Sequence, residues 1–194
     1  MTSSRFDLNA RSAFAGISVL PVGAGLGVTE REVSSIASLS VRRGQRAALE
    51  ERVAQHFGLA LPAGPRRVTA RALAAAGTGP GSWLLTCDDG GNAFIPALKS
   101  AIGDAGSVAD QSDAYGILRL SGPKLRETLA KFVPLDLHPR VFKVGDVAAT
   151  LAAHIGALLW RLEDGAEGQF TVELAVARSM AASFWHALSQ HAPS

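Results

Sequence analysis

The pattern of apolar and polar positions predicts an alternation of strands and helices along the chain. In a strand the side chains alternate between two faces, whereas in a helix one face recurs every three or four residues. Residues 33–42 follow the first pattern; Leu49, Val53 and Phe57 follow the second, before Gly58 ends the helix. The same patterns predict further strands at 68–75, 82–87, 107–111, 115–121, 147–163 and 170–178, and helices at 44–58, 92–102, from Pro123 and from about Met180.

These elements recur in the same order in two halves of the chain. The sequence therefore predicts an α+β fold of duplicated β-α-β-β-α units, with antiparallel sheets and helices packed on one face. The register of the repeat stays open, because "SWLLTC" matches "FTVELAVAR" while "LLTCDDG" also resembles "LLWRLEDG". We expect residues 31–194 to form a single domain with halves at about 31–106 and 107–194. Residues 1–30 lack periodicity and predict an extended or flexible N-terminal arm.

Composition narrows the class of protein. A hydrophobic fraction of 47% with 19% charged residues is typical of a globular chain. The mean hydropathy of +0.18 has two explanations: an apolar face that contacts a partner, or a core rich in Ala and Val. A net charge of +2 is too small to favour nucleic acid. The basic residues Arg42, Arg43, Arg46, Arg66 and Arg67 are better explained as solvated ends of elements.

The single cysteine, Cys87, excludes an internal disulfide and a site with several Cys ligands. It favours a reducing compartment, and we expect a cytoplasmic protein. The apolar run at 12–27 is interrupted by Pro21 and several glycines, which argues against an export signal. No stretch approaches the roughly 20 apolar residues of a membrane-spanning helix, so no membrane partner is expected.

Three short motifs suggest chemistry but lack its context. The glycines at 23–27 are not followed by a helix, as a dinucleotide site requires. The glycines at 77–81 lie between two expected strands and predict a hairpin loop. Ser121 and Lys124 have the Ser-x-x-Lys spacing of penicillin-binding enzymes, but the partner motifs of those enzymes are absent.

The remaining titratable residues give no convincing set of ligands or of acid and base. His186 and His191 are five residues apart, not the four of a zinc helix. The other candidates are best explained as isolated side chains or as caps and turns: His56, His138, His154, Asp88, Asp89, Asp110, Asp113, Glu163 and Asp164. We therefore predict no catalytic, cofactor-binding or metal-binding residue on this chain.

Two long segments carry a resemblance. "VADQSDAYGILRLSGPKLRETLAKFVPLDL" and "HIGALLWRLEDGAEGQFTVELAVARSMAASFWHAL" resemble folate-binding aminomethyltransferases of the glycine-cleavage type. The chain length and the first half, especially "SWLLTC", resemble more specifically the gamma-subunit family of heterotetrameric sarcosine oxidases, from about Val33 to the end. In the transferases the strand equivalent to 154–160 carries a functional Asp. Leu159 and Trp160 stand there in this chain, which implies a scaffold that has lost the folate site.

The resemblance implies a non-catalytic subunit that supports assembly of a flavoprotein complex. That complex oxidatively demethylates sarcosine to glycine and passes the methyl carbon to tetrahydrofolate. FAD, FMN, NAD and tetrahydrofolate are expected on other subunits, and the partners are the larger alpha and beta subunits together with delta. Alternatives are the equivalent subunit of N-methylglutamate dehydrogenase, a stand-alone folate-binding protein and a scaffold in another assembly. Trp83, Trp160 and Trp185 are expected in the core, with an interface as the other reading.

Overall fold

The structure is a computed structural model and describes residues 11–15, 25–165 and 168–192. Its α-helices are α1 (Arg46–Phe57), α2 (Phe94–Ile102), α3 (Leu125–Ala130) and α4 (Ala181–His191). The strands are β1 (Gly27–Glu30), β2 (Ser35–Val41), β3 (Arg67–Ala70), β4 (Leu73–Gly79), β5 (Ser82–Cys87), β6 (Gly106–Asp110), β7 (Tyr115–Ser121), β8 (Val147–Ala152), β9 (Ile155–Arg161) and β10 (Thr171–Ala177).

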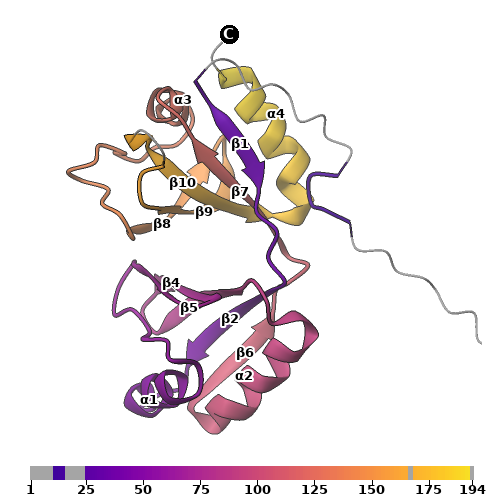
Figure 1. The fold of residues 1–194 in the computed structure, drawn as a ribbon, viewed down its shortest axis with the longest axis vertical. Coiled ribbons are helices and arrows are strands. Elements are labelled where there is room, and N and C mark those ends of the chain that lie inside the picture. Colours follow the sequence, from indigo (N-terminus) through magenta and orange to yellow (C-terminus); the bar gives the residue numbers. More distant parts are fainter. Residues whose placement is uncertain (1–10, 16–24, 166–167, 193–194) are drawn as a thin grey trace, which may run out of the picture.

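The strands form two antiparallel sheets that face each other, with helices on their outer sides (Figure 1). The first sheet has the order β6-β2-β5-β4-β3, and the second has the order β1-β7-β10-β9-β8. Helices α1 and α2 cover the outer face of the first sheet, and α3 and α4 cover that of the second. The predicted α+β fold with helices on one face of each antiparallel sheet is confirmed.

The two sheets repeat one plan, but the repeat is interleaved in sequence. β6 follows α2 and lies at the edge beside β2, whereas its counterpart β1 precedes β2 and pairs with β7. Residues 27–30, which we expected in an extended arm, are therefore a strand of the second sheet, and Phe14 is buried in the core of the same half. Residues 1–10 and 16–24 of that expected arm lie outside the described residues. Strand β6 belongs to the first sheet and ends at Asp110. The first half therefore extends beyond residue 106, where we expected the two halves to divide.

In each half, one predicted strand is a hairpin of two strands in the structure. The expected strand at 68–75 is the hairpin β3–β4, and the expected strand at 147–163 is the hairpin β8–β9. Their turns contain no Gly or Pro, and instead Arg71, Ala153 and His154 adopt positive φ angles of 54°, 51° and 68°. Such conformations are unfavourable for residues with a Cβ, so the sequence carries no signal for these turns.

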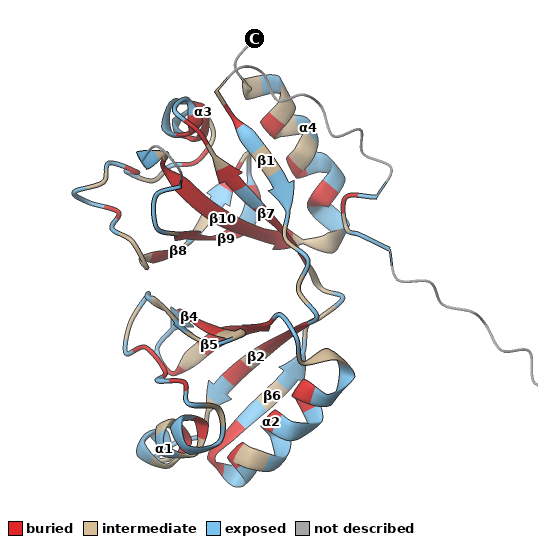
Figure 2. Cartoon of the chain, viewed as in Figure 1, coloured by how far each residue is buried: buried red, intermediate tan, exposed pale blue. Residues whose placement is uncertain are grey.

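Three apolar clusters hold the layers together. Leu49 and Val53 of α1, as the helical spacing predicted, are buried against the first sheet with Leu98 of α2. Leu125 and Phe184 belong to the corresponding cluster of the second sheet. A third cluster lies between the sheets and contains Ile36, Ala76, Leu84, Ile117, Val147, Leu158, Trp160 and Ala175. The inner strands are therefore buried on both faces, which Figure 2 shows as continuous red along β10.

Candidate functional site

A buried carboxylate lies at one end of the space between the sheets. Glu173 on β10 has no exposed surface, although it stands in the middle of an apolar strand. The register places it between Arg119 on β7 and Trp160 on β9. Glu173 Oε1 accepts hydrogen bonds from Arg119 Nε and Nη2 at 3.0 and 2.7 Å, and Oε2 accepts one from Trp160 Nε1 at 2.8 Å.

A second arginine joins this cluster from the segment that crosses between the sheets. Arg31, which follows β1, places its Nε 3.3 Å from Glu173 Oε1. Its Nη2 contacts Asp88, at the end of β5 in the first sheet, at 2.7 and 3.0 Å. Arg31 therefore links carboxylates of both sheets, and we call Arg31, Asp88, Arg119, Trp160 and Glu173 the Glu173 cluster.

Arg67 lies at the border of the Glu173 cluster. Its guanidinium carbon is 5.9 Å from the centre of the Trp160 ring, a cation–π distance. Burial lowers the pKa of Arg67, and the negative charge of Glu173 opposes this effect. A carboxylate already bonded by two arginines and an indole has little capacity left to act as a base. The Glu173 cluster is thus a buried ionic link between layers rather than an acid–base pair.

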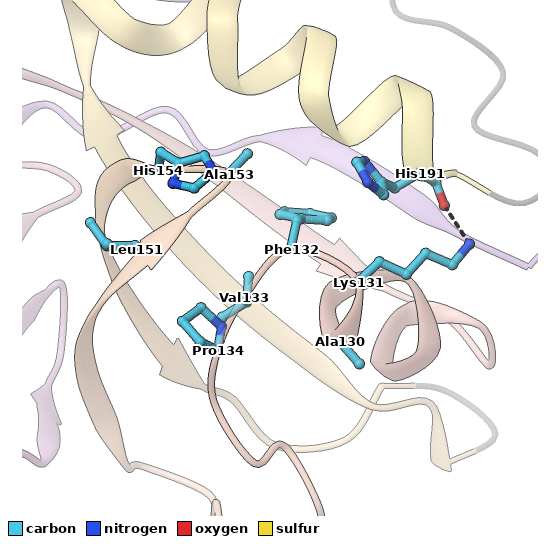
Figure 3. Close-up of a pocket in the computed structure, with 9 residues that line it drawn as sticks. All are labelled: Ala130, Lys131, Phe132, Val133, Pro134, Leu151, Ala153, His154 and His191. Atoms are coloured by element: carbon cyan, nitrogen blue, oxygen red, sulfur yellow. Dashed lines mark hydrogen bonds between the residues drawn. The ribbon is translucent and has the colours of Figure 1, made fainter.

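A second polar group lies on the opposite, outer side of the second half, in a pocket of about 560 Å³. Lys131, His154 and His191 line it and come from the end of α3, the β8–β9 turn and the end of α4 (Figure 3). His191 Nδ1 is 2.8 Å from the carbonyl oxygen of Ala187, and Lys131 Nζ donates to the carbonyl oxygen of His191 at 3.2 Å. We call these three side chains and their apolar walls the basic pocket.

The structure brings together only two of the five histidines considered from the sequence. His154 and His191 both line the basic pocket. His56 Nδ1 lies 2.9 Å from the carbonyl oxygen of Arg52 in the last turn of α1, and His138 Nδ1 accepts from the Arg140 amide in a turn. His186 is exposed on α4. The described residues hold no group of three or more His, Cys, Asp and Glu suited to a metal ion.

The other motifs have local partners. Lys124 Nζ lies 3.4 Å from Glu127, within the same turn of helix, while Ser121 ends β7. The glycines at 77–81 span the predicted turn between β4 and β5. Of the glycines at 23–27, Gly27 begins β1, and residues 23 and 24 lie outside the described residues.

The isolated carboxylates also hold turns or ion pairs. Asp110 accepts from the Ser112 hydroxyl at 2.7 Å, and Asp164 accepts from Arg161 at 2.7 Å. Asp113 and Glu163 lie in the connecting segments after β6 and β9. Cys87 is buried with its Sγ 3.6 Å from Asp89, and burial raises the pKa of its thiol, which favours the protonated form.

The tryptophans are core residues rather than exposed interface anchors. Trp83 and Trp160 are 2% and 1% exposed, and Trp185 is partly buried against the core of the second half. Sequence reasoning missed Glu173, Arg119 and Arg31 as a group. The available signal was a single charge within each of the apolar strands "TVELAVA" and "YGILRLS", since a charge there needs a partner.

The duplicated two-sheet arrangement is that of an aminomethyltransferase-like fold. The structure of glycine cleavage system aminomethyltransferase T from Bartonella henselae superposes with a TM-score of 0.58 at 16% identity, covering 85% of this chain and 45% of that one. This likeness concerns the fold alone. No helix of the described residues is long and apolar enough to cross a membrane.

The particular family follows from closer relatives. Residues 43–193 match the model of the sarcosine oxidase, gamma subunit family. The chain is 34% identical over 139 residues to sarcosine oxidase subunit gamma of Arthrobacter sp, covering 69% of this chain and 67% of that relative. A chain of the heterotetrameric sarcosine oxidase from Corynebacterium sp. U-96 superposes with a TM-score of 0.81 at 26% identity, covering 94% of each chain. This chain belongs to the sarcosine oxidase gamma subunit family, as its resemblance implied.

Proposed function

We propose that this chain is the gamma subunit of a heterotetrameric sarcosine oxidase and that it supports the assembly of the complex. The observation that carries the proposal is the superposition on a chain of such an enzyme over 94% of both chains. A match of this extent covers both sheets and the segments that cross between them. It favours a shared role over a shared fold alone.

A structural rather than a catalytic role is supported by how the polar residues are used. Both oxygens of Glu173, the most deeply buried carboxylate of the described residues, are bonded within the chain. Trp160 stands where the resemblance to transferases implies a functional acid, and its indole is itself one of the donors to Glu173. The inner polar groups therefore stabilise the two-sheet scaffold.

The proposed partners are the alpha, beta and delta subunits, in the cytoplasm. They would hold FAD, FMN, NAD and tetrahydrofolate, and the assembled enzyme would demethylate sarcosine to glycine with transfer of the methyl carbon to tetrahydrofolate. The gamma chain would supply contact surfaces rather than reacting groups.

Co-expression with the three other subunits tests the proposal. We expect this chain to copurify with them in a fixed ratio, and we expect omission of the chain to lower the yield of assembled, sarcosine-oxidising complex. A chain that folds alone and does not copurify would refute the role. If the complex oxidised N-methylglutamate in preference to sarcosine, the substrate would need revision. Tetrahydrofolate binding by the isolated chain in calorimetry would favour a folate-binding protein instead.

A further inference from the structure

The end of the β8–β9 hairpin exposes an unusual amount of apolar surface. Leu151, next to the turn, is 50% exposed, one of the few large apolar side chains so accessible among the described residues. It lines both the basic pocket and an apolar groove of about 710 Å³ on the other side of the hairpin. Pro134 lines both hollows as well. We call Pro134, Ala149, Leu151, Ala153 and His154 the hairpin surface.

Strand β8, which carries Ala149 and Leu151, is an edge strand. Its first residue, Val147, donates a backbone hydrogen bond to the carbonyl oxygen of Pro65, and the rest of the strand lacks the usual protection. β8 is the last strand of the second sheet, and its sequence "VAATLA" contains no charge and no proline. Free edge strands of soluble proteins are commonly shielded by charges, prolines or bulges, because an apolar edge pairs with other chains. An edge of this composition is typical of a surface that another chain covers.

The titratable side chains that line the basic pocket beside the hairpin surface are all basic. Lys131, His154 and His191 line the basic pocket together with Phe132, Val133 and other apolar residues, and the described residues lining it include no acid. Figure 3 shows Phe132 between the turn that carries His154 and the end of α4 that carries His191. The pocket is therefore complementary to a carboxylate attached to an apolar group.

The turn itself is held in an unfavourable conformation. Ala153 and His154 both have positive φ, a combination that hairpin turns usually reserve for Asn and Gly. With histidine rather than glycine at this position, the end of the hairpin carries a side chain at the basic pocket. A residue kept at such a cost is commonly part of a binding surface.

We propose that the hairpin surface and the basic pocket form the docking site for a larger subunit of the oxidase. The docked segment carries an acidic residue next to an apolar one. Its apolar side chain packs against Leu151 and Pro134, and its carboxylate lies beside His154, with Lys131 and His191 on the other side of Phe132. This inference rests on the proposed function, because it takes the partner to be a subunit of the assembled enzyme.

Substitutions in the co-expressed complex test the docking site. Leu151→Glu places a charge in the apolar contact, and the double change Lys131→Glu with His154→Glu reverses the sign of the pocket. We expect each to weaken copurification of the larger subunits by about 30-fold or more, as for residues at the centre of an interface. All three side chains are exposed or at the surface, and melting curves of the free variants check their folding.

The first half supplies matched controls. Thr69 on β3 occupies the hairpin position of Leu151 and is also exposed, and Arg71 lies in the corresponding turn. Thr69→Glu and Arg71→Glu are expected to leave assembly unchanged.

Three outcomes oppose the inference, and they are distinguishable. If the unaltered chain assembles and the hairpin variants assemble equally well, the docking site is wrong and the proposed function stands. If the unaltered chain fails to assemble, the proposed function fails and the docking site with it. If the isolated chain binds benzoate through Lys131, His154 and His191 while the variants assemble normally, the basic pocket is a small-molecule site instead.

Discussion

The two halves of the chain share one strand order but differ at corresponding positions. Counted from the hairpin turns, the pair Arg119–Glu173 of the second sheet occupies the register position that the pair Ser40–Ser82 has in the first. The first sheet thus places two small hydroxyls where the second places an ion pair whose carboxylate is buried and whose arginine is half exposed. The fold tolerates both, so the charged pair is a property of the second half and not a requirement of the architecture.

The outer edge strands also differ, but here the charged residues belong to the first sheet. β3, the edge strand of the first sheet, is short and begins at Arg67, next to Arg66, whereas β8 is longer and carries only small or apolar residues and one Thr. Charge is therefore inside the second sheet and at the edge of the first. The two sheets share one strand order, and the second half combines an inner ionic link with an edge strand that carries no charge.

Removal of the buried carboxylate is expected to have the largest effect on stability. Glu173→Ala leaves Arg31 and Arg119 without their shared partner. Because Arg119 is half exposed and Arg31 keeps Asp88, we expect a cost of about 2–3 kcal/mol, below the roughly 3–5 kcal/mol of a fully buried pair. Ser82→Ala, at the corresponding position, is expected to cost less than about 1 kcal/mol. Urea unfolding of the purified chain, followed by tryptophan fluorescence, measures both. Equal losses for the two variants would show that the Glu173 cluster does not stabilise the fold.

The buried tryptophans of the two halves donate their indole hydrogen bonds to different kinds of acceptor. Trp160 Nε1 donates to the Glu173 carboxylate, while Trp83 Nε1 donates to the neutral carbonyl oxygen of Pro62 at 2.9 Å. Hydrogen bonds to charged groups contribute about 1.5–3 kcal/mol and neutral ones about 0.5–1.5 kcal/mol. Trp160→Phe should therefore lower the free energy of unfolding by more than Trp83→Phe. Thermal melting followed by circular dichroism measures the difference, and the reverse order would contradict the assignment of the charged bond.

The corresponding hairpin turns of the two halves differ in backbone conformation. His154 has a φ of 68°, whereas the corresponding Ala72 is not among the residues with positive φ. His154→Gly should raise the free energy of unfolding by about 1 kcal/mol, because glycine adopts that conformation without strain. Ala72→Gly should lower it by about 0.5–1 kcal/mol, because it only adds freedom to the unfolded chain. Stabilisation of both variants, or of neither, in the same unfolding assay would contradict this difference between the turns.

These turns also mark what the sequence could and could not predict. Leu49 and Val53 have helical spacing, and "SWLLTC" is a short apolar run that follows a glycine-rich turn; both elements lie where expected. β1 is four residues long, too short for a periodic signal, and its pairing with β7 is set by contacts distant in sequence. The partners of Glu173 are likewise distant, so the site depends on a register that local patterns do not encode.

The smallest expected effect concerns the two segments that cross between the sheets. The crossing after β1 is anchored by the buried Glu173 cluster, whereas the one after β6 is anchored at the surface by Asp110, which accepts from the Ser112 hydroxyl and amide at 2.7 and 2.9 Å. These bonds, the hydroxyl first, hold the pKa of Asp110 below its usual value. Because the pKa is lowered on folding, the bonds stabilise the protein above the unfolded pKa, and this stability is lost as the pH falls through the folded pKa. Ser112→Ala should shift the pKa of Asp110 upward, toward its usual value, with little change in stability at neutral pH. A carboxyl-carbon NMR titration measures the shift, and an unchanged midpoint would show that the hydroxyl is not what anchors this crossing.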